Sequence, residues 1–283
     1  MLYIMENVNL NENEAKVSKN KERRKSFAKV ANDRLGETVM QNCGELAFIV
    51  EYVNARDITI QFKKTGELVK TEYRAFVRGW VKSHFTPTVF GIGVTGLEPA
   101  RDENGEILDS YICWRDILKR CYSSKCQKKH PTYIDCRVCD EWLYYPNFKK
   151  WYNENYYKID NKTSHLDKDI LVKGNKVYSP DTCVFAPSFI NTLFIKRQND
   201  RGELPIGVSY HKANKKYQAQ LSVFTNGKST VKHLGYFDTA NEAFEAYKKA
   251  KENYIKEVAD EYKDKIPVEL YKAMYAYEVN IDD

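Results

Sequence analysis

The chain has 283 residues, with 45 Lys and Arg against 39 Asp and Glu, which gives a formal net charge of +6. This length allows two or three domains with separate cores, and so modest a positive excess does not by itself require a polyanionic partner. The sequence lacks both an apolar run long enough to span a bilayer and the apolar block of a signal peptide. We therefore expect an intracellular protein with no membrane partner.

The first 110 residues predict a polar arm, a β-rich module and a linker. Residues 1–35 are basic and poor in large apolar side chains, as in a solvated, flexible arm, although an arm that contacts phosphates is the alternative. Within 36–97, "ELAFIVEYV" and "DITIQF" alternate apolar with polar residues, and "KKTGE" is typical of a turn. We expect a small sheet or barrel there, followed by a polar linker at 98–110.

The next module, 111–200, opens with an amphipathic helix in "SYICWRDILKRCY". Four of its residues recur at helical spacing and predict one buried stripe: Trp114, Ile117, Leu118 and Cys121. The aromatic residues of the later segment "CDEWLYYPNFKKW" could stack on bases. We expect them instead to form an aromatic core.

Seven cysteines are an odd number, and a disulfide framework is not expected in a reducing compartment. Two closely spaced pairs could supply a tetrahedral structural zinc site: Cys121 with Cys126, and Cys136 with Cys139. However, Cys121 lies on the apolar stripe of the predicted helix, where a buried thiol needs no ligand role. We therefore expect core packing here and no structural zinc.

The stretch "HLDKDILVKGNKVYSP" is followed by the apolar run "CVFAP" and the helix-like "PSFINTLF". The pattern predicts a strand, a loop, a second strand and a helix within about thirty residues. This is the outline of a ββα-metal unit. In such a unit a divalent ion, held by the first strand and the helix, stabilises charge at the scissile phosphate while a base activates water.

These residues resemble the core of HNH-type endonucleases of phages and their hosts, and the resemblance extends over roughly 37–263. It implies metal ligation by Asp167 on the first strand and Asn191 on the helix, with Asn175 as the loop asparagine that orients the base. The implied cofactor is Mg²⁺ or Mn²⁺, with no small-molecule cofactor, and the implied location is the cytoplasm of a bacterial host. Where typical members carry a histidine directly after the aspartate, this chain carries Lys168.

Strand alternation offers other candidates for the base. It puts His165, Asp167 and Asp169 on one face, so His165 or Asp169 could serve as general base beside an ion bound to Asp167. The alternative is a solvent-facing hairpin in which the two aspartates only bond to turns.

The last module, 201–263, predicts three alternating strands and a helix. "TNGK" is typical of a hairpin turn, and Thr239 with Glu242 has capping-box spacing at the start of the helix. On the middle strand, one set of residues should face the helix: Tyr217, Ala219, Leu221 and Val223. The other set should face outward: Gln218, Gln220, Ser222 and Phe224.

The remaining residues, 264–283, predict a short closing helix and tail.

This module resembles the Apetala-type, ethylene-response-factor-like DNA-binding domain through "GV", "YQAQL" and "HLGYFDTANEAFEAY". A three-stranded sheet in the major groove reads bases with amides and binds phosphates with lysines. The positions that the resemblance and the strand pattern assign to DNA contact are Ser209, His211, Lys212, Lys216, Gln218, Gln220, Ser222 and His233. A solvated polar sheet face without a partner is the alternative.

The sequence therefore predicts a modular α+β protein with a small β-module, an HNH-like ββα-metal core and a C-terminal sheet with one helix. The expected function is sequence-specific binding of double-stranded DNA with metal-dependent phosphodiester hydrolysis, as in a homing-type or phage endonuclease. The alternatives are a catalytically inactive DNA-binding protein or regulator that keeps the HNH fold, and a purely protein-binding module.

Overall fold

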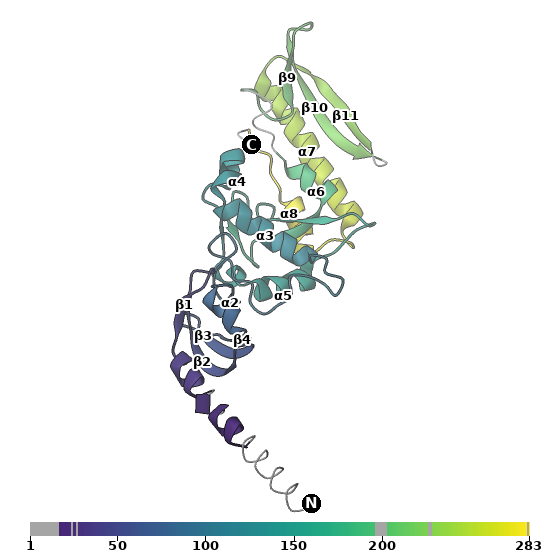
Figure 1. Ribbon diagram of the computed structural model, residues 1–283. Coiled ribbons are helices and arrows are strands. Elements are labelled where there is room, and N and C mark those ends of the chain that lie inside the picture. Colours follow the sequence, from purple (N-terminus) through teal and green to yellow (C-terminus); the bar gives the residue numbers. More distant parts are fainter. Residues whose placement is uncertain (1–16, 24, 27, 196–202, 226–227, 282) are drawn as a thin grey trace, which may run out of the picture. The chain divides into compact units, whose positions relative to one another are not determined.

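The computed structural model describes residues 17–23, 25–26, 28–195, 203–225, 228–281 and 283. The chain is mixed α and β with several small sheets, as the sequence predicts at this level (Figure 1). It forms two compact units, one made of the described residues up to 102 with 144–146, and the other of 103–143 with the described residues from 147 onward. None of the helices in the described ranges has the length and apolar character needed to cross a bilayer.

The first unit is built on one antiparallel four-stranded sheet in the order β1-β2-β3-β4. The two strands expected from alternation are present as β2 and β3, and α2 follows the sheet. The elements are β1 Thr38–Met40, β2 Leu46–Asn54, β3 Asp57–Phe62, β4 Leu68–Thr71 and α2 Tyr73–Val77. Their core consists of Ala47, Ile49, Ile58, Ile60, Phe62, Phe76 and Val81. Ahead of this sheet, the described residues of 17–34 are helical.

In the second unit, the predicted amphipathic helix is α3, Asp109–Tyr122, and its stripe of four apolar residues is buried as expected. The later aromatic residues pack on one another. Trp142 lies 5.0 Å from Phe148 and 4.6 Å from Trp151 between ring centroids. Trp142 and Phe148 are fully buried, so these rings form the aromatic core. The neighbouring elements are α4 Ser124–Lys129, η1 Pro131–Tyr133, β5 Arg137–Val138, η2 Asp140–Leu143 and α5 Tyr145–Asn155.

A strand, a loop, a second strand and a one-turn helix follow in the order that the sequence predicts. Strand β6, Ser164–Asp167, pairs antiparallel with β8, Val184–Pro187. Helix α6, Ser188–Asn191, continues into η3, Thr192–Phe194. The loop between the strands contains β7, Val177–Tyr178, which pairs parallel with β5. This pairing anchors the middle of the loop to the preceding part of the unit.

The C-terminal sheet has the order β11-β10-β9 and lies against helix α7. Its elements are β9 Val208–His211, β10 Lys216–Thr225, β11 Lys228–Phe237 and α7 Ala240–Tyr262. The predicted capping box of Thr239 and Glu242 is present at the start of α7. Gly207 has a φ of +77°, and a Cβ at this position would overlap the ring of Tyr247. A glycine is therefore required where β9 begins against the helix.

Helix α7 contributes residues to two hydrophobic cores. Its first half packs under the sheet through Ala243, Phe244 and Tyr247. Its second half packs on the strand–loop–strand–helix region, together with α8, Val268–Tyr275. The residues of this second core include Val184, Ala186, Ile190, Ile255, Val258, Ala259, Leu270 and Met274. This second core thus joins parts of the segments 111–200, 201–263 and 264–283. Helix α7 can serve both cores because its apolar stripe is longer than the sheet that it covers.

Candidate functional site

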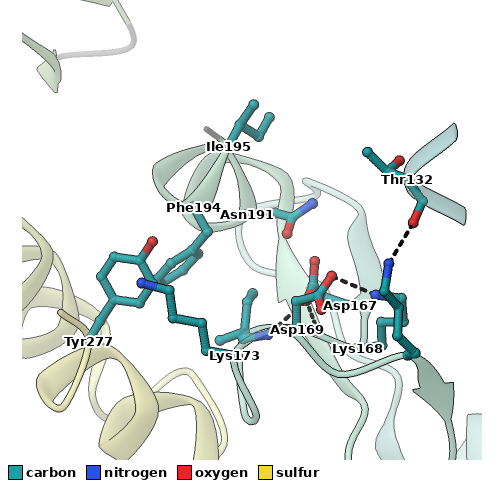
Figure 2. Close-up of a pocket in the computed structure, with 12 residues that line it drawn as sticks. Thr132, Asp167, Lys168, Asp169, Lys173, Asn191, Phe194, Ile195 and Tyr277 are labelled. Carbon is teal, nitrogen blue, oxygen red and sulfur yellow. Dashed lines mark hydrogen bonds and ion pairs between the residues drawn. The ribbon is translucent and has the colours of Figure 1, made fainter. Parts of the chain in front are cut away.

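A cavity of about 310 Å³ lies at the end of β6. Asp167 comes from the last position of β6, Asp169 from the loop that follows it, and Asn191 from the end of α6. Figure 2 shows the two carboxylates and the carboxamide of Asn191 turned toward the same space. The two residues expected to bind the metal, Asp167 and Asn191, thus line one cavity together with one candidate for the base.

The carboxylate of Asp167 is held by the backbone of the loop that follows it. Its Oδ1 accepts hydrogen bonds from the N–H groups of Asp169, at 2.7 Å, and Ile170, at 2.9 Å. Burial raises the pKa of Asp167, and these two donors only partly oppose that shift. A cation in the cavity would favour the ionised carboxylate.

Lys168 points away from solvent, with 6% of its surface exposed. Its Nζ donates to the backbone oxygen of Asn175 at 2.6 Å and to Oδ2 of Asp169 at 2.7 Å. The side chain of Asn175 closes the loop, since its Nδ2 donates to the backbone oxygens of Lys168 and Val177 and its Oδ1 accepts from the N–H of Val177. The loop asparagine therefore fixes the position of Lys168 and not that of a histidine.

His165 does not share the cavity at the end of β6. It lines a separate hollow of about 250 Å³ between β6 and α3, together with Asp116 and Arg120. Alternation predicts one common face for His165, Asp167 and Asp169, but β6 ends at Asp167 and the chain turns there. Asp169 therefore reaches the cavity from a bend, and of the two candidates for the base only Asp169 lies beside Asp167.

Two further lysines, for which the sequence predicts no role, stand at the rim of the cavity. Lys173 pairs with the carboxylate of Asp283 at 2.9 Å and lies over the ring of Tyr277. Lys176 donates to the backbone oxygen of Thr132 at 3.1 Å. Asp283 compensates the charge of Lys173, so Lys176 is the rim lysine that can offer its charge to a phosphate.

The four cysteines considered as zinc ligands differ in burial. Cys121 and Cys136 are buried, whereas Cys126 and Cys139 are partly exposed. Burial raises the pKa of the Cys121 thiol to about 12, which keeps it protonated. Within the described ranges, no three His, Cys, Asp or Glu side chains are arranged as a metal site.

The outer face of the C-terminal sheet carries the polar residues that the sequence assigns to it. Ala219 and Leu221 are buried under α7, with Tyr217 and Val223 packed beside them, so the predicted facing of β10 is confirmed. The residues on the opposite face are Ser209, His211, Gln218, Gln220, Ser222, Phe224 and His233. Lys212 is exposed beyond the end of β9. Lys216 forms an ion pair with Asp238 at 3.0 Å, so this lysine is already partly compensated.

Tyr236 is an outward residue that strand alternation misses. Counting from His233 would direct Tyr236 toward the helix, but the ladder between β10 and β11 shifts register at Ala219 and Gln220. The bulge turns Tyr236 to the outer face, where its ring centroid lies 4.7 Å from that of His233 and 5.1 Å from that of His211. Gly235, with a φ of +140°, marks the position of the bulge and was the available signal.

Comparisons of the chain with protein-family models, with curated proteins and with solved structures found no match.

Proposed function

We propose that the protein binds double-stranded DNA through the outer face of the β9–β11 sheet and hydrolyses phosphodiester bonds at the cavity beyond β6. The observation that carries the catalytic part is the common cavity of Asp167, Asp169 and Asn191. The resemblance of this region to HNH-type endonucleases supports the same assignment.

The oxygen atoms in the cavity suit a Mg²⁺ or Mn²⁺ ion. Mg²⁺ is commonly held by one or two carboxylates plus substrate phosphate, so a site without three protein carboxylates is sufficient. Asp167 and Asn191 would hold the ion, and the ion would stabilise charge on the phosphate and its leaving oxygen. Asp169, whose side chain is half exposed, is the group in reach to accept a proton from water.

The DNA-binding part rests on the sheet. Its outer face combines amides and hydroxyls with two histidines and a tyrosine, while Lys212 stands at its edge. Amide side chains such as Gln220 can pair with adenine edges, and lysines supply contacts to phosphates.

A second candidate function is DNA binding without cleavage. Lys168 favours this candidate. Its ammonium group donates to the backbone oxygen of Asn175, the loop asparagine, and pairs with Asp169. A protonated lysine cannot accept a proton, and its ion pair makes Asp169 a weaker base.

The test is to incubate supercoiled plasmid with the full chain and Mg²⁺ or Mn²⁺, and to measure DNA binding on the same preparation. The variant Asp167→Asn should lose nicking and keep binding, while the matched surface variant Asp181→Asn should behave as wild type. Binding without nicking would select the second candidate. A folded protein that neither binds nor nicks DNA would exclude both.

A further inference from the structure

A second cavity, of about 540 Å³, lies where α6 and η3 approach β10 and α7. Its apolar walls include Phe189, Leu193, Ile206 and Tyr247. The volume falls within the range of about 300–1,000 Å³ typical of small-molecule sites. None of its described lining residues is acidic, whereas Lys251 of α7 is basic. The cavity therefore combines apolar walls with uncharged polar groups and one positive group.

Lys251 is an unusual residue in this position because only 9% of its surface is exposed. Within the described part of the chain it has no hydrogen bond or ion pair, and burial lowers its pKa to about 8. A charge with little access to water and no partner among the described residues destabilises a fold, and lysine is almost never fully buried unless it is paired. An anion in the cavity would supply the missing partner.

The edge of β10 offers one further donor to the same space. Strand β9 pairs with β10 only as far as Ala219, after which Gln220 donates its N–H to the backbone oxygen of Gly207. Four positions beyond Gln220 on the same strand, Phe224 donates its N–H to the hydroxyl of Tyr254 at 2.7 Å. Because N–H groups alternate in direction along a strand, the N–H of Ser222 lies on this edge between them. Ser222 itself lines the cavity.

We infer that this cavity binds a small organic carboxylate with an aliphatic or aromatic body, whose charged group pairs with Lys251 beside the edge of β10. The two oxygens of a carboxylate match the ammonium group and the N–H of Ser222. The body of the ligand packs against the apolar walls of the cavity. The phosphates of a DNA duplex do not meet this description, because they lack an apolar body and Lys251 is buried.

The experiment uses the full chain and straight-chain carboxylates from acetate to octanoate, with benzoate, each beside its uncharged amide. Affinity is measured by ligand-observed NMR and calorimetry at constant ionic strength. At least one longer carboxylate should bind wild type about tenfold or more tightly than its amide, which is the size expected for a charge-assisted hydrogen bond. Lys251→Met should abolish this preference, while Lys249→Met, an exposed lysine of the same helix, should keep it.

Lys251→Met removes a buried charge, so the ligand-free variant should be at least as stable as wild type. Lys251→Gln removes the same charge and replaces Lys251→Met in the binding measurement if the methionine variant does not fold. The inference is overturned if no carboxylate binds wild type more tightly than its amide, or if the preference survives in the folded Lys251 variant.

Discussion

The ammonium group of Lys168 lies 2.6 Å from the backbone oxygen of Asn175. The two side chains lock one loop, because the carboxamide of Asn175 in turn donates to the backbone oxygen of Lys168. In the proposed ββα-metal unit, the residue held in this way is the one expected to act as the base. Under the proposed function, the loop therefore holds the residue at the position of the base, but Lys168 cannot accept a proton in its protonated form.

The first prediction concerns Lys168→His. An imidazole at this position can accept a proton near neutral pH and can keep the hydrogen bond to the loop carbonyl. We expect Mg²⁺-dependent nicking of plasmid DNA to rise by about 10²- to 10⁴-fold, the usual contribution of a general base. The rate is measured under single-turnover conditions.

Lys168→Met is the control for this substitution, because it removes the ammonium group without adding a base. If the histidine and methionine variants cleave at the same rate, the side chain at 168 is not the missing base.

The second prediction concerns Asp167 and pH. Burial raises the pKa of this carboxyl above that of the unfolded chain, so ionising it destabilises the folded state. The destabilisation is absent below the unfolded-state pKa and complete above the folded-state pKa. Asp167→Asn keeps an oxygen acceptor for the N–H groups of Asp169 and Ile170. We therefore expect this variant to be more stable than wild type at neutral pH in EDTA, and this advantage to vanish as the pH falls.

Divalent ions should reverse the order of stability of wild type and Asp167→Asn. Mg²⁺ or Mn²⁺ should stabilise wild type, by about 2.7 kcal/mol at a hundred times the dissociation constant, and leave Asp167→Asn unchanged. Denaturant unfolding with and without the ions measures both effects. A metal response of equal size in the two proteins would remove Asp167 from the ligand set.

The third prediction separates two kinds of contact on the sheet. Gln220→Ala should lower affinity for the preferred DNA site by about 1–3 kcal/mol and leave other sequences nearly unaffected, as expected for a base contact. Lys212→Ala should weaken binding to all sequences and reduce the slope of log affinity against log salt by about one. Competition binding across salt concentrations measures both effects. Equal losses on all sequences in both variants would mean that Gln220 does not read bases.

Local patterns in the sequence predicted the elements that depend on near neighbours. The spacing of Thr239 and Glu242 predicted the capping box, and the alternation along β10 predicted which side Ala219 faces. Such features follow from the helical and strand periods alone. The order of strand, loop, strand and helix around the cavity was predictable for the same reason.

The features that the sequence did not predict depend on where a period breaks or on distant partners. Alternation was extended past Asp167 to Asp169, although β6 ends at Asp167. His165 lines a different hollow from Asp167, together with residues of the distant helix α3. The bulge at Gly235 reversed the direction of Tyr236. The cavity that Lys251 lines brings α6 and η3 together with α7, and no local pattern encodes that meeting.

The final prediction concerns the two cores joined by α7. Ile255 is fully buried against residues of β8, α6 and α8, far along the helix from the part that covers the sheet. Ile255→Ala should therefore cost about 2–5 kcal/mol, whereas the exposed neighbour Glu257→Ala should change stability by less than about 0.5 kcal/mol. Because one helix serves both cores, hydrogen exchange should accelerate in both 164–195 and 206–237 of the Ile255 variant. Faster exchange limited to 164–195 would show that the sheet and its helix are independent of the second core.

For the same reason, a fragment of 201–263 alone should expose the apolar second half of α7 and self-associate. A monomeric, cooperatively folded fragment would likewise show that the sheet and its helix are independent of the second core.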